Sequence, residues 1–545
     1  MKKIHLFVVA FSLICLQSVA QDVYNGQSSK WLKIAAATQP KLVSFTKKPV
    51  SIVTLSKDEK AFQGWKISSK TDIESFYSTS MKKQSGITLD FGEHLTGFVT
   101  FKIDVIDRAF ADAPIRFKFT FAEMPAEAVL PFDPYSGSLS RAWLQDEIVT
   151  VSEVPATITI PRRVAFRYVR IDLLGSSKSS NFKISELHVD ATTSAKQKVE
   201  ALAPETPELI RKIDQVGLNT LKECMQTVYE DGPKRDRRLW IGDLYLESLA
   251  NQYSYKNDSL TKHCLYLLAG LCYENGVVPP NVFERPQPHA PYGPLFDYAL
   301  IFNVALKEYL ISTGDTVTAN DLWTVAKEQV QIPKKYLLSD DMMDYQRAAK
   351  EWWVFFDWKN GLDKQASLQG CVIWAYQNTY ELAKMLGKEK EVAELPALIE
   401  KMTKAARKNL YDTQKKVFVS GKDKQVSYAS QAWMVLSGVA TKKEGAKALL
   451  ALPHMPDVVC PGAPYMYHYV VEAMIMTGLN QEAKETIASY WGGMVNKGAD
   501  TFWEVYDPTD DLVSPYKSFL VNSYCHAWSC TPVYFIRKYP EIFQK

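Results

Sequence analysis

Charged side chains of both signs are concentrated between residues 231 and 243, where the sequence reads DGPKRDRRLWIGD. The stretch holds three aspartates, Asp231, Asp236 and Asp243, together with a lysine, three arginines and Trp240. A solvated turn with salt bridges along its rim is the plain interpretation of such a cluster. Trp240 favours more than that, because a large ring beside several carboxylates suits a polar binding site with an apolar wall.

A further carboxylate, Glu504, lies beside aromatic residues in the segment GADTFWEVYD, directly after Trp503. Cleavage of a glycosidic bond needs two carboxyl groups facing each other across it. One is a protonated acid for the leaving oxygen, and the other is a base for water or a nucleophile. Glu504 and the aspartates of the 231–243 stretch are candidates for such a pair. The alternative for Glu504 is a charge at a helix N-terminus or a partner for an arginine.

Two more polar residues stand in apolar surroundings. Asp357 and Trp358 belong to the aromatic run EWWVFFDWKNGLD, most of which is expected in a core. An aspartate is costly to bury unpaired, so Asp357 is expected to bind an arginine or face a cavity. His526, in NSYCHAW, would by itself more often be a core histidine with its hydrogen bonds made. No metal-ligand set, phosphate loop or Ser/His/Asp signature is present, so neither metal nor cofactor is expected.

The elements that position these residues follow from the periodicity of the apolar side chains. Alternation of apolar and polar residues marks six segments: 87–91, 98–103, 115–121, 156–160, 166–173 and 182–187. Alternation indicates strands with one buried face, and six or more strands without a helix signal predict a β-sandwich. Residues 132–137 are expected to form a long loop, and the polar stretch 191–208, with two prolines, predicts a domain boundary.

From residue 209 on, the period changes to 3.6, and about twelve helices are predicted up to residue 538. Four apolar helical runs each end at a glycine, which is the signal of a helix C-terminus followed by an antiparallel neighbour. These glycines are Gly314, Gly387, Gly438 and Gly478. Helical hairpins in this number suggest an (α/α)6 barrel, with a helical array as the structural alternative. The chemically rich loops are long and the glycine loops are short, as expected of a barrel with one functional face.

The bulk properties set the class of protein. The chain has 545 residues, of which 46% are hydrophobic and 23% charged, as in a globular protein of several domains. Lys2 and Lys3, an apolar run and the small residues at 18–20 form a secretory signal, so a secreted, periplasmic protein starting at Gln21 is expected. The apolar run is too short for a retained membrane anchor. A net charge of +3 gives no electrostatic reason to bind nucleic acid.

These motifs resemble those of a known family, the α-L-rhamnosidases of glycoside hydrolase family 78. DGPKRDRRLWIGD resembles the family signature Asp-Cys-Pro-x-Arg-Glu-Arg-x-Gly-Trp-x-Gly-Asp. FFDW resembles its Gly-Asp-Trp, GADTFWEVYD its Thr-x-Trp-Glu core, and NSYCHAW its His-containing segment. The matches follow the family's order and span the helical part of the chain. The resemblance implies a six-hairpin (α/α)6 barrel with β-sandwiches upstream, in agreement with the periodicity.

The resemblance also implies residue roles. Asp236 falls on the general acid and Glu504 on the general base of a hydrolysis that removes terminal α-L-rhamnosyl residues with inversion. The residues that it implies for the sugar subsite are Asp231, Arg235, Trp240, Asp243, Asp357, Trp358, Trp503 and His526. No cofactor is needed, and the partner is a rhamnose-containing glycan or glycoside. Asp236 stands where the family has Glu, which shortens the side chain by one C–C bond, ~1.5 Å.

The sequence therefore predicts a multidomain α and β protein, with a β-sandwich over residues 21–195 and a barrel over residues 196–545. Two other functions stay open. One is a six-hairpin glycosidase for another sugar such as a uronic acid, which extra arginine in the pocket would favour. The other is a catalytically silent glycan-binding protein. The sandwich is expected either to bind glycan or to buttress the barrel.

Overall fold

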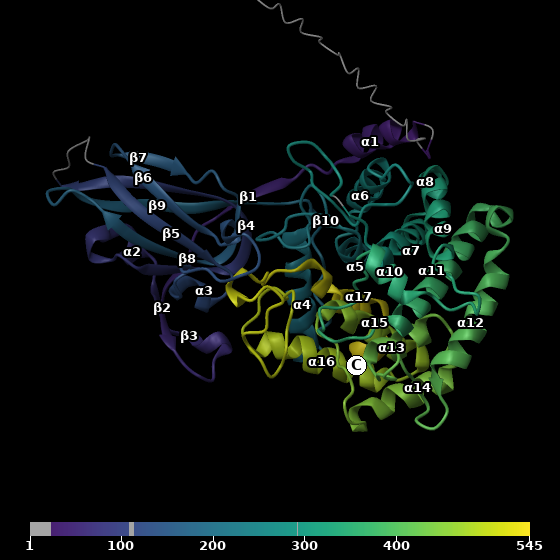
Figure 1. Ribbon diagram of the computed structural model, residues 1–545. Coiled ribbons are helices and arrows are strands. Elements are labelled where there is room, and N and C mark those ends of the chain that lie inside the picture. The colour runs from purple at the N-terminus through teal and green to yellow at the C-terminus, as the bar shows by residue number, and fades with distance from the viewer. Residues whose placement is uncertain (1–22, 25, 108–113, 292) are drawn as a thin grey trace, which may run out of the picture.

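The computed structural model describes residues 23–24, 26–107, 114–291 and 293–545. It has a sheet domain beside a larger helical domain (Figure 1). The predicted secretory signal at residues 1–20 lies outside the described residues. Within the described ranges, no helix is long and apolar enough to cross a membrane.

In the described residues the sheet domain contains nine strands and two short helices. They are β1 (Val43–Lys47), β2 (Ser51–Lys57), β3 (Trp65–Asp72), α2 (Glu74–Ser78), β4 (Ile87–Asp107), β5 (Ile115–Ala122), α3 (Pro125–Val129), β6 (Asp146–Val151), β7 (Ala156–Thr159), β8 (Val164–Gly175) and β9 (Asn181–Thr193). All six alternating segments lie in strands, two of them in β4, apart from a terminal residue of one. The predicted loop at 132–137 contains no helix or strand.

Strand β4 is shared by two layers of sheet. Its first half pairs with β2 and β8, and its second half, from Gly97 on, pairs with β9 and β7. A Cβ at Gly97 would lie 2.2 Å from the Asp190 carbonyl oxygen, so the strands approach too closely there for any side chain. Phe101 of β4 meets Phe119 of β5 at a ring-centroid distance of 4.8 Å. Rings from the two layers thus fill one core, and the predicted sandwich is confirmed.

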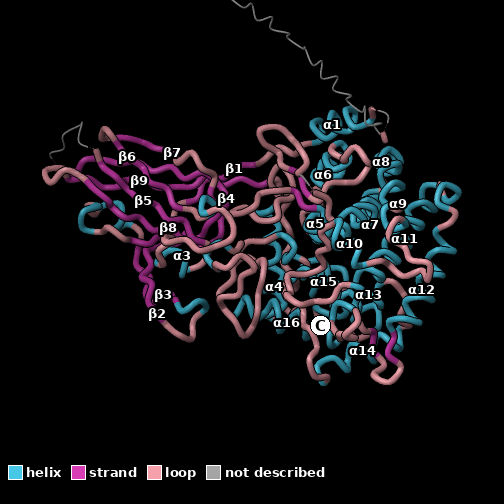
Figure 2. The backbone as a smooth tube through the Cα atoms, in the orientation of Figure 1, coloured by secondary structure: helices cyan, strands magenta, loops and turns pink. Residues whose placement is uncertain are grey.

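The helical domain follows. Its helices are α4 (Glu208–Cys224), α5 (Ile241–Gln252), α6 (Asp258–Gly270), α7 (Phe296–Thr313), α8 (Thr316–Gln329), α9 (Gln331–Lys334), α10 (Tyr345–Glu351), α11 (Gln365–Leu386), α12 (Leu395–Leu410), α13 (Tyr428–Leu436), α14 (Lys442–Ala451), α15 (Pro464–Thr477), α16 (Asn480–Asn496), α17 (Pro532–Lys538) and α18 (Pro540–Phe543). Figure 2 shows the helices gathered on one side of the molecule and the strands on the other.

The helices form two rings. The inner helices α5, α7, α11, α13 and α15 pack in that order, and the 3-10 turn Ala527–Cys530 before α17 contacts both α15 and α5, which closes the ring. Helices α4, α6, α8, α12, α14 and α16 pack around it. Inner helices such as α7 are buried on nearly all sides, whereas outer helices such as α12 keep an exposed face. This arrangement is the predicted (α/α)6 barrel.

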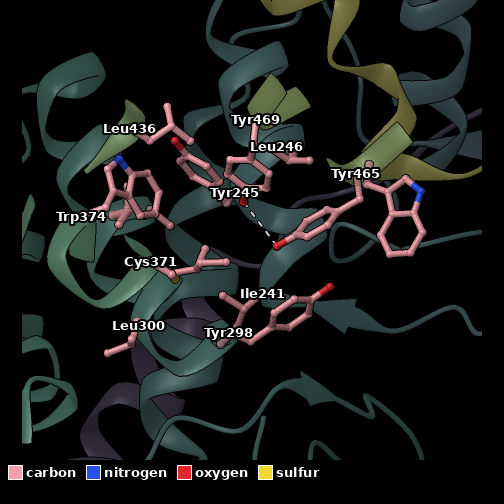
Figure 3. Packing of buried hydrophobic residues seen from close by; sticks show 14 of the residues in the cluster. Ile241, Tyr245, Leu246, Tyr298, Leu300, Cys371, Trp374, Leu436, Tyr465 and Tyr469 are labelled. Atoms are coloured by element: carbon pink, nitrogen blue, oxygen red, sulfur yellow. Dashed lines mark hydrogen bonds between the residues drawn. The ribbon is translucent and has the colours of Figure 1, made fainter. Parts of the chain in front are cut away.

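The predicted helix-ending glycines are confirmed. Gly314, Gly387 and Gly478 follow α7, α11 and α15 with φ of +69°, +68° and +84°, and Gly438 has φ +67° just after the cap of α13. These are left-handed backbone conformations that favour glycine. In the barrel core, Tyr298 lies near Tyr465, whose hydroxyl accepts a 3.3 Å hydrogen bond from the Tyr469 hydroxyl (Figure 3).

A helix that precedes the sheets belongs to the barrel. Helix α1 (Gln27–Thr38) packs against α6 (Figure 1). The side chain of Trp31 on α1 is fully buried. The Tyr24 hydroxyl donates to the carbonyl oxygen of Gly276 at 2.5 Å. The sequence did not indicate this helix, because only Trp31 and Ala35 are buried on it and the apolar stripe is narrow. Of the span predicted as sandwich, the strand-forming part begins at Val43.

Candidate active site

A cavity of about 270 Å³ opens at one end of the barrel, where the loops before several inner helices meet. Eight of the ten residues that the sequence assigned to a site line it: Asp231, Arg235, Asp236, Trp240, Asp243, Trp358, Glu504 and His526. The other lining residues are Leu139, Arg238, Leu295, Tyr298, Trp353, Phe355, Tyr516 and Trp528. The fold thus joins the chemically rich loops of the helical domain and adds one residue, Leu139, from the sheet domain.

The loop that carries the aspartates is tightly packed. A Cβ on Gly232 would lie 2.5 Å from Ser523 Oγ and 2.6 Å from the Arg235 carbonyl oxygen, so only glycine fits without a shift. Arg237 has φ +64°, which turns the chain sharply. The Asp231 carbonyl oxygen accepts the Ala527 N–H at 2.7 Å. These contacts tie the 231–243 loop to the segment that holds His526.

Glu504 is fixed from several directions and is only 1% exposed. Its two carboxylate oxygens are met by the guanidinium of Arg235 and the hydroxyl of Tyr516. Its backbone N–H donates to the Ser523 carbonyl oxygen at 3.0 Å, and its carbonyl oxygen accepts Trp528 Nε1–H at 3.0 Å. Charge-assisted contacts of this kind hold a carboxylate in one orientation.

Arg235 lies between the two predicted catalytic carboxylates. Its Nη1 is 3.7 Å from Asp236 Oδ1, while its Nη2 contacts Glu504. Its Nε–H donates to the Val521 carbonyl oxygen at 3.0 Å, and its guanidinium lies 4.3 Å from the centre of the Tyr516 ring. One buried guanidinium therefore fixes Asp236 and Glu504 with respect to each other.

Asp236 is the less buried of the pair, with a side chain 18% exposed. Its Oδ2 lies 3.5 Å from Arg238 Nη1, and Arg238 in turn stacks on Phe283 at 4.0 Å. The neighbouring Asp231 accepts the backbone N–H groups of Arg238 and Asp236 at 3.0 and 3.3 Å. Burial, reinforced by the negative charge of Asp236, raises the pKa of Asp231 to about 7.

Asp243 and His526 form a second polar pair in the cavity. Asp243 Oδ1 lies 3.4 Å from His526 Nε2, and both side chains are buried. Burial raises the pKa of Asp243. Burial also opposes protonation of His526, but the contact with Asp243 outweighs it, so the pKa of the His526 imidazole is raised. Asp243 Oδ1 and both ring nitrogens of His526 have no hydrogen-bond partner among the described residues. Buried polar atoms without partners on a cavity wall are available to a polar ligand.

Aromatic rings form the rest of the wall. Trp353 meets Trp240 and Trp358 at centroid distances of 6.4 and 6.1 Å, and Phe355 stacks on Trp528 at 5.9 Å. Trp353 is 45% exposed, so it stands at the rim. Rings of this kind cover the C–H faces of a sugar. The aromatic run and the NSYCHAW segment contained this signal, because Trp353 and Phe355 lie in the first and Trp528 is the last residue of the second.

Two predicted site residues lie elsewhere. Asp357 is 4% exposed and does not line the cavity; instead of an arginine it binds the backbone N–H groups of Gly462 and Trp358, at 2.7 and 2.8 Å. Burial raises its pKa to about 7. The ring of Trp503 is fully buried outside the cavity, stacked on Phe62 of the sheet domain at 4.1 Å. Both residues thus lie behind the cavity wall. Asp357 binds the backbone of Trp358, and Trp503 packs at the interface between the two domains.

Within the described ranges, no group of three or more His, Cys, Asp or Glu side chains is arranged to hold a metal ion. The cavity itself presents carboxyl groups, an imidazole and aromatic rings. Two carboxyl groups on the wall of one cavity, here Asp236 and Glu504, are the groups that hydrolysis of a glycosidic bond uses.

Comparison with known proteins agrees with this geometry. The family model described as the bacterial alpha-L-rhamnosidase six-hairpin glycosidase domain matches residues 206–539, and the glycosyl hydrolase family 78 alpha-rhamnosidase N-terminal domain matches residues 49–191. The chain belongs to the bacterial α-L-rhamnosidases of family 78. The resemblance seen in the sequence motifs is confirmed, and the two matched domains correspond to the helical and the sheet domain.

Solved structures extend the comparison. A rhamnosidase from Klebsiella oxytoca with rhamnose bound is 38% identical, with a TM-score of 0.90 over 94% of this chain and 99% of that one. The family 78 rhamnosidase of Bacillus sp. GL1 is 20% identical (TM-score 0.67; 83% of this chain, 46% of that one). The Streptomyces avermitilis α-L-rhamnosidase complexed with L-rhamnose is 14% identical (TM-score 0.65; 92% and 44%). These last two share the fold, and the chain matches under half of their length. No curated protein sequence matches the chain.

Proposed function

We propose that this family member removes terminal α-L-rhamnosyl residues from a glycan or glycoside with inversion, Asp236 acting as the acid and Glu504 as the base. The observation that carries the proposal is that both carboxylates line one cavity and contact the same guanidinium, that of Arg235. The rhamnose bound to the 38% identical Klebsiella oxytoca rhamnosidase supports the choice of sugar.

In the proposed reaction, a water molecule beside Glu504 attacks the anomeric carbon while its proton passes to the Glu504 carboxylate. Arg235 and Tyr516 both donate to that carboxylate, which keeps its free lone pairs aimed in one direction. Inverting enzymes separate their two carboxyl groups by about 6.5–9.5 Å, so that water fits beside the sugar. The guanidinium between Asp236 and Glu504 supports a spacing of this kind, because it keeps the two groups from meeting directly.

Asp236 gives its proton to the glycosidic oxygen as the bond to the anomeric carbon breaks, and the leaving group departs as a neutral alcohol. Although Asp236 is one carbon shorter than the glutamate of the family motif, it lines the cavity. Asp231 lies beside it, and burial raises the pKa of Asp231 to about 7, so Asp231 holds a proton on the acid side of neutral pH. A protonated carboxyl next to Asp236 provides a nearby source of the proton that a general acid must deliver.

The remaining lining residues suit a neutral deoxysugar. Asp243 and His526 present unpartnered polar atoms to the sugar hydroxyls, and Trp240 and Trp358 offer ring faces to its C–H groups and methyl. The arginines among the lining residues, Arg235 and Arg238, each contact a carboxylate of the protein. A uronic acid would need a cation of its own, which disfavours that alternative. We further propose secretion to the periplasm, which sequencing of the mature N-terminus, expected at Gln21, tests.

The test is hydrolysis of an aryl α-L-rhamnoside by the wild type, Asp236→Asn and Glu504→Gln, with the product anomer followed by NMR. Each substitution is expected to lower kcat by about 10²–10⁴, the usual contribution of a general acid or base. Glu400→Gln, an exposed carboxylate on α12, is the matched control and is expected to leave kcat unchanged. First release of the retained anomer, or full activity of Glu504→Gln, would contradict the mechanism. Binding of L-rhamnose without turnover of any glycoside would favour the silent glycan-binding protein.

A further inference from the structure

The sheet domain reaches the catalytic loop through a group of buried charges. Lys234, which precedes Arg235, has a side chain only 2% exposed, with its Nζ 3.1 Å from Glu123 Oε2 and in contact with Glu127 Oε1. Glu123 directly follows β5, and Glu127 lies in α3, so both acids belong to the sheet domain. The lysine of the catalytic loop is thus held by the other domain.

The acids themselves are held rigidly. Glu127 Oε2 accepts the backbone N–H groups of Glu123 and Met124, at 2.8 Å each, which caps α3. Glu123 accepts the Tyr524 N–H at 2.7 Å and lies 3.1 Å from His94 Nε2. Carboxylates with their remaining lone pairs satisfied by fixed donors form a rigid anchor for an ammonium group.

The anchor also touches the segment of the second carboxylate. Lys234 Nζ lies 5.1 Å from the centre of the Tyr524 ring, and the Tyr524 carbonyl oxygen accepts the Thr501 hydroxyl at 2.8 Å. Thr501 lies in the same segment as Glu504, and Tyr524 lies in the same segment as His526. One cluster therefore meets both the 231–243 loop and the segment around Glu504.

We infer that Lys234, held by Glu123 and Glu127 of the sheet domain, is a positioning residue that sets the place of Arg235 and Asp236 against Glu504. A buried ion pair adds little net stability over an apolar pair of the same size, so domain attachment alone does not explain a buried lysine here. What an ammonium between two fixed carboxylates does supply is a single position for the backbone that carries it. The next residue is the arginine that contacts both catalytic carboxylates.

This inference rests on the proposed function, and it gives the sheet domain a part in catalysis through the support that it provides. It agrees with another contact between the domains at the site. The Ser138 N–H donates to the Tyr516 carbonyl oxygen at 2.9 Å, and Leu139 beside it lines the cavity. Tyr516 is the residue whose hydroxyl holds Glu504. The sheet domain thus supports the acid side of the cavity through Lys234 and the base side through Tyr516.

The test compares wild type with Lys234→Met, Lys234→Arg, Glu127→Gln and a control. In Glu127→Gln the amide oxygen can still cap α3, while the amide NH₂ replaces the oxygen that met Lys234. The control, Thr192→Val, removes another hydrogen bond between the domains, from Thr192 Oγ1 to Gln226 Oε1 at 3.1 Å, and neither residue belongs to the 231–243 loop. Thermal unfolding and L-rhamnose affinity are measured for every variant alongside kcat and KM.

A displacement of about 1 Å costs about 100-fold in rate, so Lys234→Met is expected to lower kcat on a phenyl α-L-rhamnoside by about that factor. The substitution is expected to displace Asp236, the proposed acid. The loss of rate is therefore expected to be smaller on a dinitrophenyl rhamnoside, whose leaving group departs without a proton from an acid. Lys234→Arg is expected to recover part of the rate and Glu127→Gln to lose part of it. Thr192→Val is expected to keep the wild-type kcat.

Wild-type kcat in Lys234→Met and Glu127→Gln, with only the unfolding temperature lowered, would overturn the inference, because the cluster would then serve domain attachment alone. The same rate loss on both leaving groups, matched by Thr192→Val, would also overturn it. If the wild type hydrolyses no rhamnoside, the proposed function fails separately. Crystal structures of wild type and Glu127→Gln then decide the inference, by whether the Arg235 guanidinium leaves Glu504.

Discussion

The raised pKa of Asp231 makes a prediction about pH. Asp231 has a pKa of about 7, and the Asp236 N–H donates to its Oδ2 at 3.3 Å. Below about pH 7 Asp231 carries a proton, and above about pH 7 Asp231 is ionised and has none to pass to the acid. We therefore expect kcat/KM to be level on the acid side of pH 7 and to fall about tenfold for each pH unit above it.

The perturbation is Asp231→Asn. The substitution removes the carboxyl that holds a proton near pH 7, while Arg235 and Arg238 remain 3.7 and 3.5 Å from the Asp236 carboxylate. The alkaline limb is therefore expected to move to lower pH. Each unit of movement corresponds to about 1.4 kcal/mol of lost interaction with the proton. Activity at neutral pH falls accordingly, even though the acid itself is untouched.

The assay is kcat/KM on a phenyl α-L-rhamnoside over the acid, neutral and mildly alkaline range, for wild type and Asp231→Asn. A dinitrophenyl rhamnoside is the control substrate, because its leaving group departs without a proton and its alkaline limb is expected to disappear. An alkaline limb at the same pH in both proteins would refute the reasoning, since the proton would then come from another group. A limb that persists with the dinitrophenyl substrate would refute it as well.

Three further substitutions separate the cavity from its surroundings. Trp353→Ala, at the exposed rim, is expected to raise KM for an aryl rhamnoside and to leave the unfolding temperature unchanged; an unaltered KM in steady-state assays would remove Trp353 from the substrate path. Trp503→Ala removes a buried ring that stacks on Phe62, so it is expected to lower the free energy of unfolding measured in urea by about 3–5 kcal/mol and to leave KM unchanged. A raised KM would instead indicate that Trp503 contacts the sugar. The added Cβ in Gly232→Ala would lie 2.5 Å from Ser523 Oγ, so this substitution is expected to lower the free energy of unfolding by about 1–3 kcal/mol and to lower kcat. An unchanged free energy of unfolding would mean that the loop can shift to accommodate the methyl group.

The regular parts of the fold could be predicted from periodicity, because a buried face repeats every two residues in a strand and every 3.6 in a helix. The prediction missed β1, β2, β3 and β6, where intermediate and exposed positions predominate, so that alternation is weak. It also missed α1, whose two buried residues make too narrow a stripe. In these segments burial is decided by distant parts of the chain, and the local pattern carries little of that information.

The site was predictable where local chemistry was unusual. The charges around Asp236 and the rings around Glu504 stand out in the sequence, yet their meeting depends on a fold that joins residues 268 positions apart. Asp357 shows the limit of such reasoning. A buried aspartate does need partners, but they are backbone N–H groups, and one belongs to Gly462, 105 residues away. Tyr516 had no signal at all, because its importance lies in one hydroxyl contact with Glu504.

The packing of α1 changes how the two domains are to be regarded. The chain lies on the barrel at α1, leaves it to form the sheets, and returns at α4. The sheet domain is in that sense an insertion within the helical domain, connected to it by two segments of the chain. It therefore cannot rotate about a single linker. A helical domain cut free at the predicted boundary would lose α1 and uncover the α6 surface that α1 covers. Such a fragment would need α1 added back, as a separate peptide or by circular permutation, to be a fair test of what the barrel does alone.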